Sequence, residues 1–357
     1  MTKQMAGLLG FFRRGLIMEQ RKDPALSAEL RQLAGPEHRS ALPDYTPVTD
    51  IQQLDADQII YLARLARIVD ERDGLPLFRK LKAARSREVT LLVDAMDDEP
   101  YISSQLGPML HLQEECASGA SLAQKATGAK GIQILVYKTI NDLELRIPKS
   151  IRGLRVQRVG GVYPAEGWEE VSRLRQQGTI PFYVGACALI HLHRAVYEGL
   201  AQTTAFVTVA GDCVDQPANL EVPIGMTATR ALEVCGLIAQ PNRVIAGGSM
   251  TGVSLRDTDR EAIGPMTRAL LAFREDERDH GYVCIGCGRC TEVCPSGLDP
   301  RFICACLDRG RPDQLAKTDY AHCIGCMSCS YSCPAKLDLA ARIYRLSRHQ
   351  AQEEVGP

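Results

Sequence analysis

The sequence lacks features that would place it in several other classes of protein. No apolar stretch reaches the roughly 18 residues that a membrane-spanning helix needs, so we expect no transmembrane segment. Lys and Arg together number 42 and Asp and Glu 43, which leaves a formal net charge of -1. Because a protein that mainly binds nucleic acid usually carries a basic excess, this balance argues against nucleic acid as a partner.

Cysteine is scarce over most of the chain and concentrated near its C-terminal end. Of the 14 cysteines, ten lie between Cys284 and Cys333 and four lie elsewhere. A disulfide-stapled secreted protein would spread its cysteines along the chain and begin with a signal peptide, and we expect neither here. The cysteine usage therefore predicts a cytoplasmic protein, in a reducing compartment, with a metal-bearing C-terminal module.

Residues 1–58 show no clear fold pattern and are assigned to an N-terminal helical or arm segment. Residues 1–18 carry an apolar stripe that includes Phe11 and Phe12, with an arginine pair on another side. This stripe could pack on its own domain, or it could dock peripherally on a partner, a membrane surface or a shell. Residues 21–58 are polar and rich in turn formers, which is typical of helices with loops or of a connecting arm.

Residues 59–200 alternate between helical and strand patterns. This rhythm predicts an α/β domain with a largely parallel sheet. We expect His191 and His193, on an apolar helix, to pack rather than to bind metal. The predicted strands fall at 89–95, 131–137 and 154–159, and the predicted helices at 59–66, 116–125 and 189–196.

Residues 201–258 have the order hairpin, helix, strand, which is typical of a compact β-grasp domain. A charged stretch at 274–279 then reads as a linker or a solvated helix end. The cysteine-rich domain is assigned to residues 270–357. The β-grasp strands are expected at 205–210, 218–223 and 243–248, and its helix at 228–235.

Two copies of one cysteine motif, C-x2-C-x2-C-x3-C-P, carry the chemistry. The first ends at Cys294-Pro295 and the second at Cys333-Pro334. In bacterial two-cluster ferredoxins, three cysteines of such a run hold one [4Fe-4S] cluster and the fourth ligates the other cluster. The sequence therefore predicts two ligand sets: Cys284, Cys287, Cys290 and Cys333 for cluster 1, and Cys323, Cys326, Cys329 and Cys294 for cluster 2.

Zinc is the main alternative to clusters at these cysteines. Zinc sites also use C-x2-C pairs, but two complete runs with the same final proline favour clusters. The insert of 28 residues between the runs predicts the helical type of two-cluster domain found in multi-subunit oxidoreductases. Cys304 and Cys306 lie in this insert, and we expect them to pack on a helix rather than to bind a further centre. Ile285 and Ile324 are predicted to shield the clusters and tune their potentials.

Over roughly residues 73–348 the chain resembles the RnfC family. This family includes the C subunit of the Rnf complex and the cobalamin reductase of propanediol microcompartments, and it shares a core with the NADH-binding flavin subunit of respiratory complex I. The resemblance implies an α/β flavin-subunit-like core, a β-grasp domain of the SLBB type and a helical two-cluster ferredoxin domain. It rests on the cysteine runs, on the β-grasp segments Val207–Asp212, Val222–Gly225 and Ala246–Leu255, and on Glu99–Ile102, Tyr163-Pro164 and Arg194–Gly199.

The resemblance also implies FMN in the α/β domain, but three flavin-contacting segments are altered. The family's glycine-rich loop G-x-G-G-A-G-F-P-T is replaced by Asp73–Phe78, which keeps one glycine. The family's N-x-x-E-C-E-P becomes Asp94–Pro100, and Asn-Val becomes Gly185-Ala186. Side chains at former glycine positions obstruct the close approach of a flavin, and acidic charge accumulates where its phosphate would lie. We therefore expect FMN binding to be lost.

These observations favour an iron–sulfur electron-transfer subunit, which would be a component of an oxidoreductase without catalytic residues of its own. It would relay electrons through two [4Fe-4S] clusters between a partner flavoprotein or ferredoxin and another redox subunit. Two alternatives stay open: an FMN-dependent NADH reductase of the RnfC or cobalamin-reductase type, and a redox scaffold that docks to a membrane complex or a microcompartment shell. Membrane association through partners and enclosure in a microcompartment both remain compatible with the cytoplasmic expectation.

Overall fold

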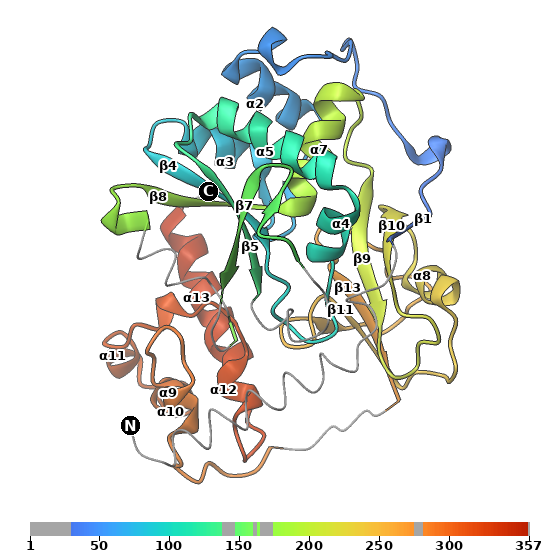
Figure 1. The fold of residues 1–357 in the computed structure, drawn as a ribbon. Helices are drawn as coiled ribbons and strands as arrows, with labels where there is room; N and C mark the ends of the chain where they lie inside the picture. The colour runs from blue at the N-terminus through green and yellow to red at the C-terminus, as the bar shows by residue number, and fades with distance from the viewer. Residues whose placement is uncertain (1–29, 138–146, 160–162, 165–173, 275–280, 356–357) are drawn as a thin grey trace. The chain divides into compact units, whose positions relative to one another are not determined.

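The computed structural model describes residues 30–137, 147–159, 163–164, 174–274 and 281–355 (Figure 1). The chain divides into two compact units, the first reaching to residue 275 and the second starting at 276, with residues 250–252 grouped with the second. The predicted stripe at 1–18 and nearly all of the charged stretch at 274–279 lie outside the described residues.

The first unit contains a five-stranded sheet that confirms the predicted α/β class. Its strand order is β6-β7-β5-β4-β8, in which β6 is antiparallel to β7 and the other pairs are parallel. Sequence patterning missed β8, because Pro181 interrupts the apolar run. A proline is tolerated here because β8 is an edge strand. The strands are β4 (Val89–Ala95), β5 (Ile132–Tyr137), β6 (Ser150–Ile151), β7 (Leu154–Val159) and β8 (Ile180–Gly185).

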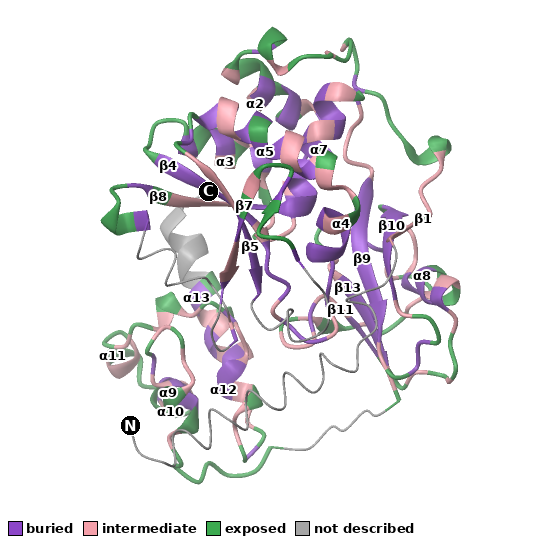
Figure 2. Cartoon of the chain, viewed as in Figure 1, coloured by how far each residue is buried: buried purple, intermediate pink, exposed green. Residues whose placement is uncertain are grey.

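Helices cover one face of this sheet and build the main core with it (Figures 1 and 2). Leu91 and Val93 of β4 belong to this core, whereas Leu92 belongs to a small cluster on the opposite face, as the two-residue period of a strand requires. The helices are α2 (Ala56–Leu65), α3 (Leu77–Ala84), α4 (Leu106–His111), α5 (Gln113–Thr127) and α7 (Ala186–Tyr197), and a ribbon of β2 (Val69–Asp70) and β3 (Leu75–Pro76) precedes α3.

Helices α5 and α7 approach each other closely at one glycine. A Cβ at Gly119 would lie 2.0 Å from the carbonyl oxygen of Leu189, so only glycine allows this contact. The histidines of α7 pack as predicted. His191 is buried with its ring centroid 5.5 Å from that of Phe206, and Nδ1 of His193 lies 2.9 Å from Oγ of Ser118.

The second sheet of this unit contains the predicted hairpin and strand, and the predicted helix lies between them in the chain. Its order is β1-β10-β9-β13-β11-β12, with β9 and β10 forming the antiparallel hairpin. The N-terminal segment was expected to form helices with loops or an arm, but three of its residues add a strand parallel to β10. The elements are β1 (Leu30–Gln32), β9 (Thr204–Ala210), β10 (Ala218–Pro223), α8 (Ala228–Cys235), β11 (Arg243–Ala246), β12 (Val253–Ser254) and β13 (Ala269–Phe273).

A buried charged network joins helices α5 and α7 to the second sheet within the first unit. Arg194 of α7 donates to Glu221 of β10 at 2.5 Å and to Glu115 of α5 at 2.7 Å. Oγ1 of Thr204 also donates to Glu221, at 2.9 Å. The α/β and β-grasp elements thus share one compact unit, and the boundary between residues 200 and 201 stays a prediction.

The second unit consists of several short helices and one longer C-terminal helix around a small core of its own. Leu298, Ile303, Leu339 and Ile343 form this core together with cysteines of both runs. The insert between the two cysteine runs is helical, as the sequence predicts. The elements are α9 (Arg289–Glu292), α10 (Pro300–Asp308), α11 (Pro312–Leu315), a 3-10 turn (Tyr320–His322), α12 (Ser328–Tyr331) and α13 (Ala340–Val355).

Candidate metal centres

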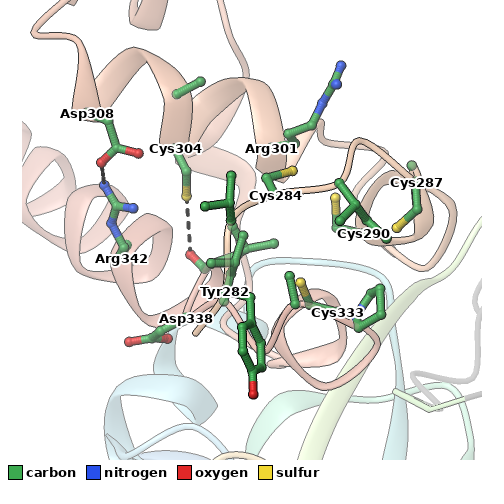
Figure 3. Close-up of a pocket in the computed structure, with 18 residues that line it drawn as sticks. Tyr282, Cys284, Cys287, Cys290, Arg301, Cys304, Asp308, Cys333, Asp338 and Arg342 are labelled. Carbon is green, nitrogen blue, oxygen red and sulfur yellow. Dashed lines mark hydrogen bonds and ion pairs between the residues drawn. The ribbon is translucent and has the colours of Figure 1, made fainter. Parts of the chain in front are cut away.

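A cavity of about 430 Å³ in the second unit is lined by four cysteines from both runs. Cys284, Cys287 and Cys290 come from the first run and Cys333 from the end of the second (Figure 3). Cys284 and Cys287 are exposed, Cys290 is buried and Cys333 is partly buried. The structure therefore brings together the four residues predicted for cluster 1.

A second, much smaller cavity of about 20 Å³ is lined by the other four cysteines. Cys323, Cys326 and Cys329 come from the second run and Cys294 from the end of the first, and the described lining carries no charged side chain. Each cavity thus takes three cysteines from one run and the fourth from the other. This crossed pattern is the one the spacing predicts, and the roles of the eight residues as ligands remain a proposal.

Left-handed backbone positions shape both cysteine loops in the same way. Gly286 and Gly325, the third residues of the two runs, both have φ of 71°. Gly288 (φ 77°) directly precedes α9, and Met327 (φ 63°) takes the equivalent position before α12. Because residues with a Cβ rarely adopt this conformation, it is less favourable at Met327 than at Gly288.

The donor sets fit [4Fe-4S] clusters, whose usual ligands are four cysteine thiolates. Burial raises the pKa of Cys329 to about 12 and raises that of Cys323, so binding iron at these thiols would release protons. The backbone N–H of Leu298 donates to Sγ of Cys294 at 3.3 Å, which shows a sulfur already held by the loop. The first cavity has ample room. The second is much smaller.

Four further residues of this unit carry predictions made from the sequence. Ile285 lines the first cavity and Ile324 the second, yet they are 71% and 48% exposed, so both lie at the rims. Cys304 and Cys306 are buried, as expected for packing cysteines. Cys304 also lines the first cavity, which the spacing of the two runs does not indicate. Cys304 lies three residues after Arg301, so both side chains are on one face of α10 and both line this cavity. This helical spacing is the sequence feature that could have indicated its position.

In the first unit, a buried carboxylate lies against Gly185, in one of the segments where the resemblance implies a flavin contact. Asp70 is fully buried, and its Oδ2 lies 2.5 Å from Nζ of Lys80. Both of its carboxylate oxygens lie 3.2 Å from the backbone N of Gly185, at the start of α7. A helix N-terminus at the carboxyl ends of parallel strands is where such sheets bind phosphate-bearing ligands. Asp70 occupies that position with an anion of the chain itself.

Other side chains fill the same region. Nε of Arg72 lies 2.5 Å from Asp94, and its guanidinium lies 4.4 Å from the ring centroid of Tyr183. Asp97 is fully buried and accepts hydrogen bonds from two backbone N–H groups of α4 and its N-cap and from Arg268 at 3.0 Å. Glu99 packs directly on Gly248, where a Cβ would lie 1.8 Å from its carboxylate. These residues do not fit FMN, because the carboxylate of Asp70 already holds the helix N-terminus that a flavin phosphate would use.

Two family models match segments of the chain. The family model described as SLBB domain matches residues 206–254, and the model described as 4Fe-4S binding domain matches residues 282–297 and 320–336. The C subunit of the ion-translocating oxidoreductase complex of Vibrio cholerae is 26% identical over 303 residues. The C subunit of the proton-translocating ferredoxin:NAD(+) oxidoreductase complex of Clostridium ljungdahlii is 28% identical over 290 residues. The chain is thus similar to the C subunits of ion-translocating and proton-translocating oxidoreductase complexes.

The chain matches only part of these relatives. The two alignments cover 78% and 75% of this chain but 38% and 62% of the respective relative, less than two thirds of either. A solved structure, the NAD+-reducing [NiFe]-hydrogenase in its H2-reduced state, aligns with a TM-score of 0.51 over 69% of this chain and 52% of that chain. At 17% identity this likeness supports the fold alone. Among the described helices, none is both long and apolar enough to cross a bilayer.

Proposed function

We propose that this RnfC-like chain is an iron–sulfur electron-transfer subunit. It relays electrons through two [4Fe-4S] clusters between a partner flavoprotein or ferredoxin and another redox subunit. The observation that carries the proposal is the crossed arrangement of eight cysteines around two cavities. When bound, such clusters supply one-electron chemistry without a substrate pocket or proton transfer.

The chain's own residues hold and separate the two centres. Cys294 and Cys333 each follow one run but line the cavity of the other, so the two sites are fixed beside each other in one unit. The rim residues Ile285 and Ile324 exclude water from part of each cavity. Apolar surroundings and hydrogen bonds to sulfur, such as that from Leu298 to Cys294, are the protein's means of tuning a cluster potential.

Electrons enter from another protein in this proposal, because Asp70 and Arg72 are held in ion pairs with Lys80 and Asp94 in the region where a flavin would bind. The curated relatives are subunits of ion-translocating and proton-translocating complexes. By this likeness we propose that the chain works as a peripheral subunit at the cytoplasmic side of a membrane complex, held there by partner proteins. The scaffold alternative rests on residues 1–18, which lie outside the described residues.

The test is anaerobic purification followed by quantification of iron, sulfide and flavin. We expect about eight irons and eight sulfides per chain and no flavin. A matched control replaces Cys213 and Cys235, two buried cysteines of the first unit, by alanine and should leave the iron content unchanged. Failure to hold iron and sulfide after anaerobic reconstitution would end the proposal. Stoichiometric flavin, with clusters reduced by NADH, would favour the reductase alternative.

A further inference from the structure

A fifth thiol lines the cavity of the first cluster site. Cys304 lies on α10, on the face that also presents Arg301, Ala305 and Asp308 to the cavity. Its side chain is 3% exposed, and it belongs to the same small core as Cys290. Figure 3 shows Sγ of Cys304 directed at a backbone carbonyl, that of Leu339, at a distance of 3.8 Å. This is a long and weak hydrogen bond, so little holds the thiol in its present direction.

The neighbouring Cys306 shows that this placement is specific. It is equally buried and lies on the same helix two residues further on, but it does not line the cavity. Its Sγ lies 4.0 Å from Oε1 of Gln314 instead. The second cavity, within its described lining, contains four cysteines and no additional one. The fifth thiol therefore belongs to the larger and more open site.

The ligands of that site are the ones that need a substitute. Cys284 and Cys287 are exposed, whereas every cysteine of the second site is buried or partly buried. Exposed thiolates are the most easily oxidised, and an oxidised cysteine no longer binds iron. A [4Fe-4S] cluster that loses one cysteine has an iron corner with an open coordination position.

We propose that Cys304 is a reserve ligand of the first cluster. The idea rests on the proposed function, since it needs a cluster in that cavity. When one of the four cysteines is lost, the S–H bond of Cys304 breaks, its proton passes to solvent, and its sulfur forms a bond to the iron that the lost cysteine has released. No electron is transferred in this exchange. The chain thus keeps a four-iron cluster where a three-iron cluster or an empty site would otherwise result.

The experiment counts iron and records EPR spectra of full-length, anaerobically reconstituted variants. Cys290→Ala removes one buried ligand next to Cys304 in the small core. We expect C290A to keep about eight irons per chain and the double variant C290A/C304A to keep about four or seven, with a three-iron signal in the latter case. The matched control is C290A/C306A, which should behave as C290A does. C329A, at the second site, should lose iron whether or not Cys304 is present.

Several outcomes would overturn the proposal. C290A could lose first-cluster iron while Cys304 is intact, or C290A/C304A could keep about eight irons. The EPR signal of the second cluster reports folding of the unit in every first-site variant, so a misfolded variant is recognised directly. Wild-type protein without clusters would instead refute the proposed function. C304A alone should keep both clusters, since Cys304 is not a ligand in the intact protein.

Discussion

Replacing Arg194 by methionine should destabilise the first unit by about 3–5 kcal/mol, the usual cost of breaking a buried ion pair. Arg194 is 8% exposed and lies between the carboxylates of Glu221 and Glu115, at 2.5 and 2.7 Å. Its removal leaves Glu221, itself 3% exposed, charged and without a cation. Methionine keeps an unbranched apolar stem, so the change removes charge and hydrogen bonds more than packing volume.

The assay is urea unfolding followed by two signals. Far-UV circular dichroism reports the whole chain, and visible absorbance of the clusters reports the second unit. Because the two units need not unfold together, separate midpoints are expected. R194M should lower the midpoint of the first unit and leave that of the cluster absorbance unchanged. The control is Arg230→Met: the Arg230–Glu233 pair is 66% and 53% exposed, and such pairs contribute about 0–1 kcal/mol.

The double variant R194M/E221Q tests whether the unpaired charge of Glu221 causes the loss of stability. Neutralising Glu221 removes the buried charge that R194M leaves behind, so the double variant should recover part of the lost stability. An R194M protein within about 1 kcal/mol of wild type would show that the network contributes little, since that is the range of exposed pairs. A double variant less stable than R194M would show that the buried charge is not the cause.

Three further predictions concern iron release, pH and helix packing. A chelator should remove iron from the first cluster before the second, as EPR can follow, because Cys284 and Cys287 are exposed; simultaneous loss would contradict this. Burial raises the pKa of Glu71 from 4.5 to about 7, so its folded form favours the protonated acid and stability falls as pH rises through that range. Glu71→Gln should therefore flatten the difference in unfolding free energy between pH 5 and pH 8, and an unchanged difference would refute the assignment. Gly119→Ala should lower the free energy of unfolding by at least about 1–3 kcal/mol, the usual effect of overpacking, because the new Cβ would meet the carbonyl of Leu189. An unchanged Tm would count against this close contact.

Sequence patterning predicted most of the elements that have a clear period. The strand Val89–Ala95 is an apolar run, and the spacing of the two cysteine runs indicated which thiols share a cavity. It missed β8, where Pro181 breaks the pattern, and β1, whose three residues are too few to show one. Strand addition at an edge depends on unpaired backbone groups elsewhere in the chain, and local patterns do not contain that information.

The grouping of the eight cysteines around two cavities was predictable, but the surroundings of these cavities were not. Spacing places Cys294 and Cys333 at the opposite site, yet it says nothing about the contrast between cavities of about 430 and 20 Å³. The loss of glycines predicted an obstructed flavin loop. It did not predict that Asp70 would accept from Gly185, because this contact joins residues 115 positions apart. Such contacts depend on tertiary structure, whereas glycine content is a local property.

The position of Asp70 also bears on whether the stability of the first unit depends on a bound cofactor. A ligand that binds only the folded state stabilises it according to the ligand's concentration. In the first unit the anion at the start of α7 is part of the chain, so it is present at a fixed ratio of one to one. The stability of that unit should then be independent of flavin supply, whereas cluster binding links the second unit to iron. In a cell short of iron, the first unit would reach its final form while the second alone remains dependent on metal delivery.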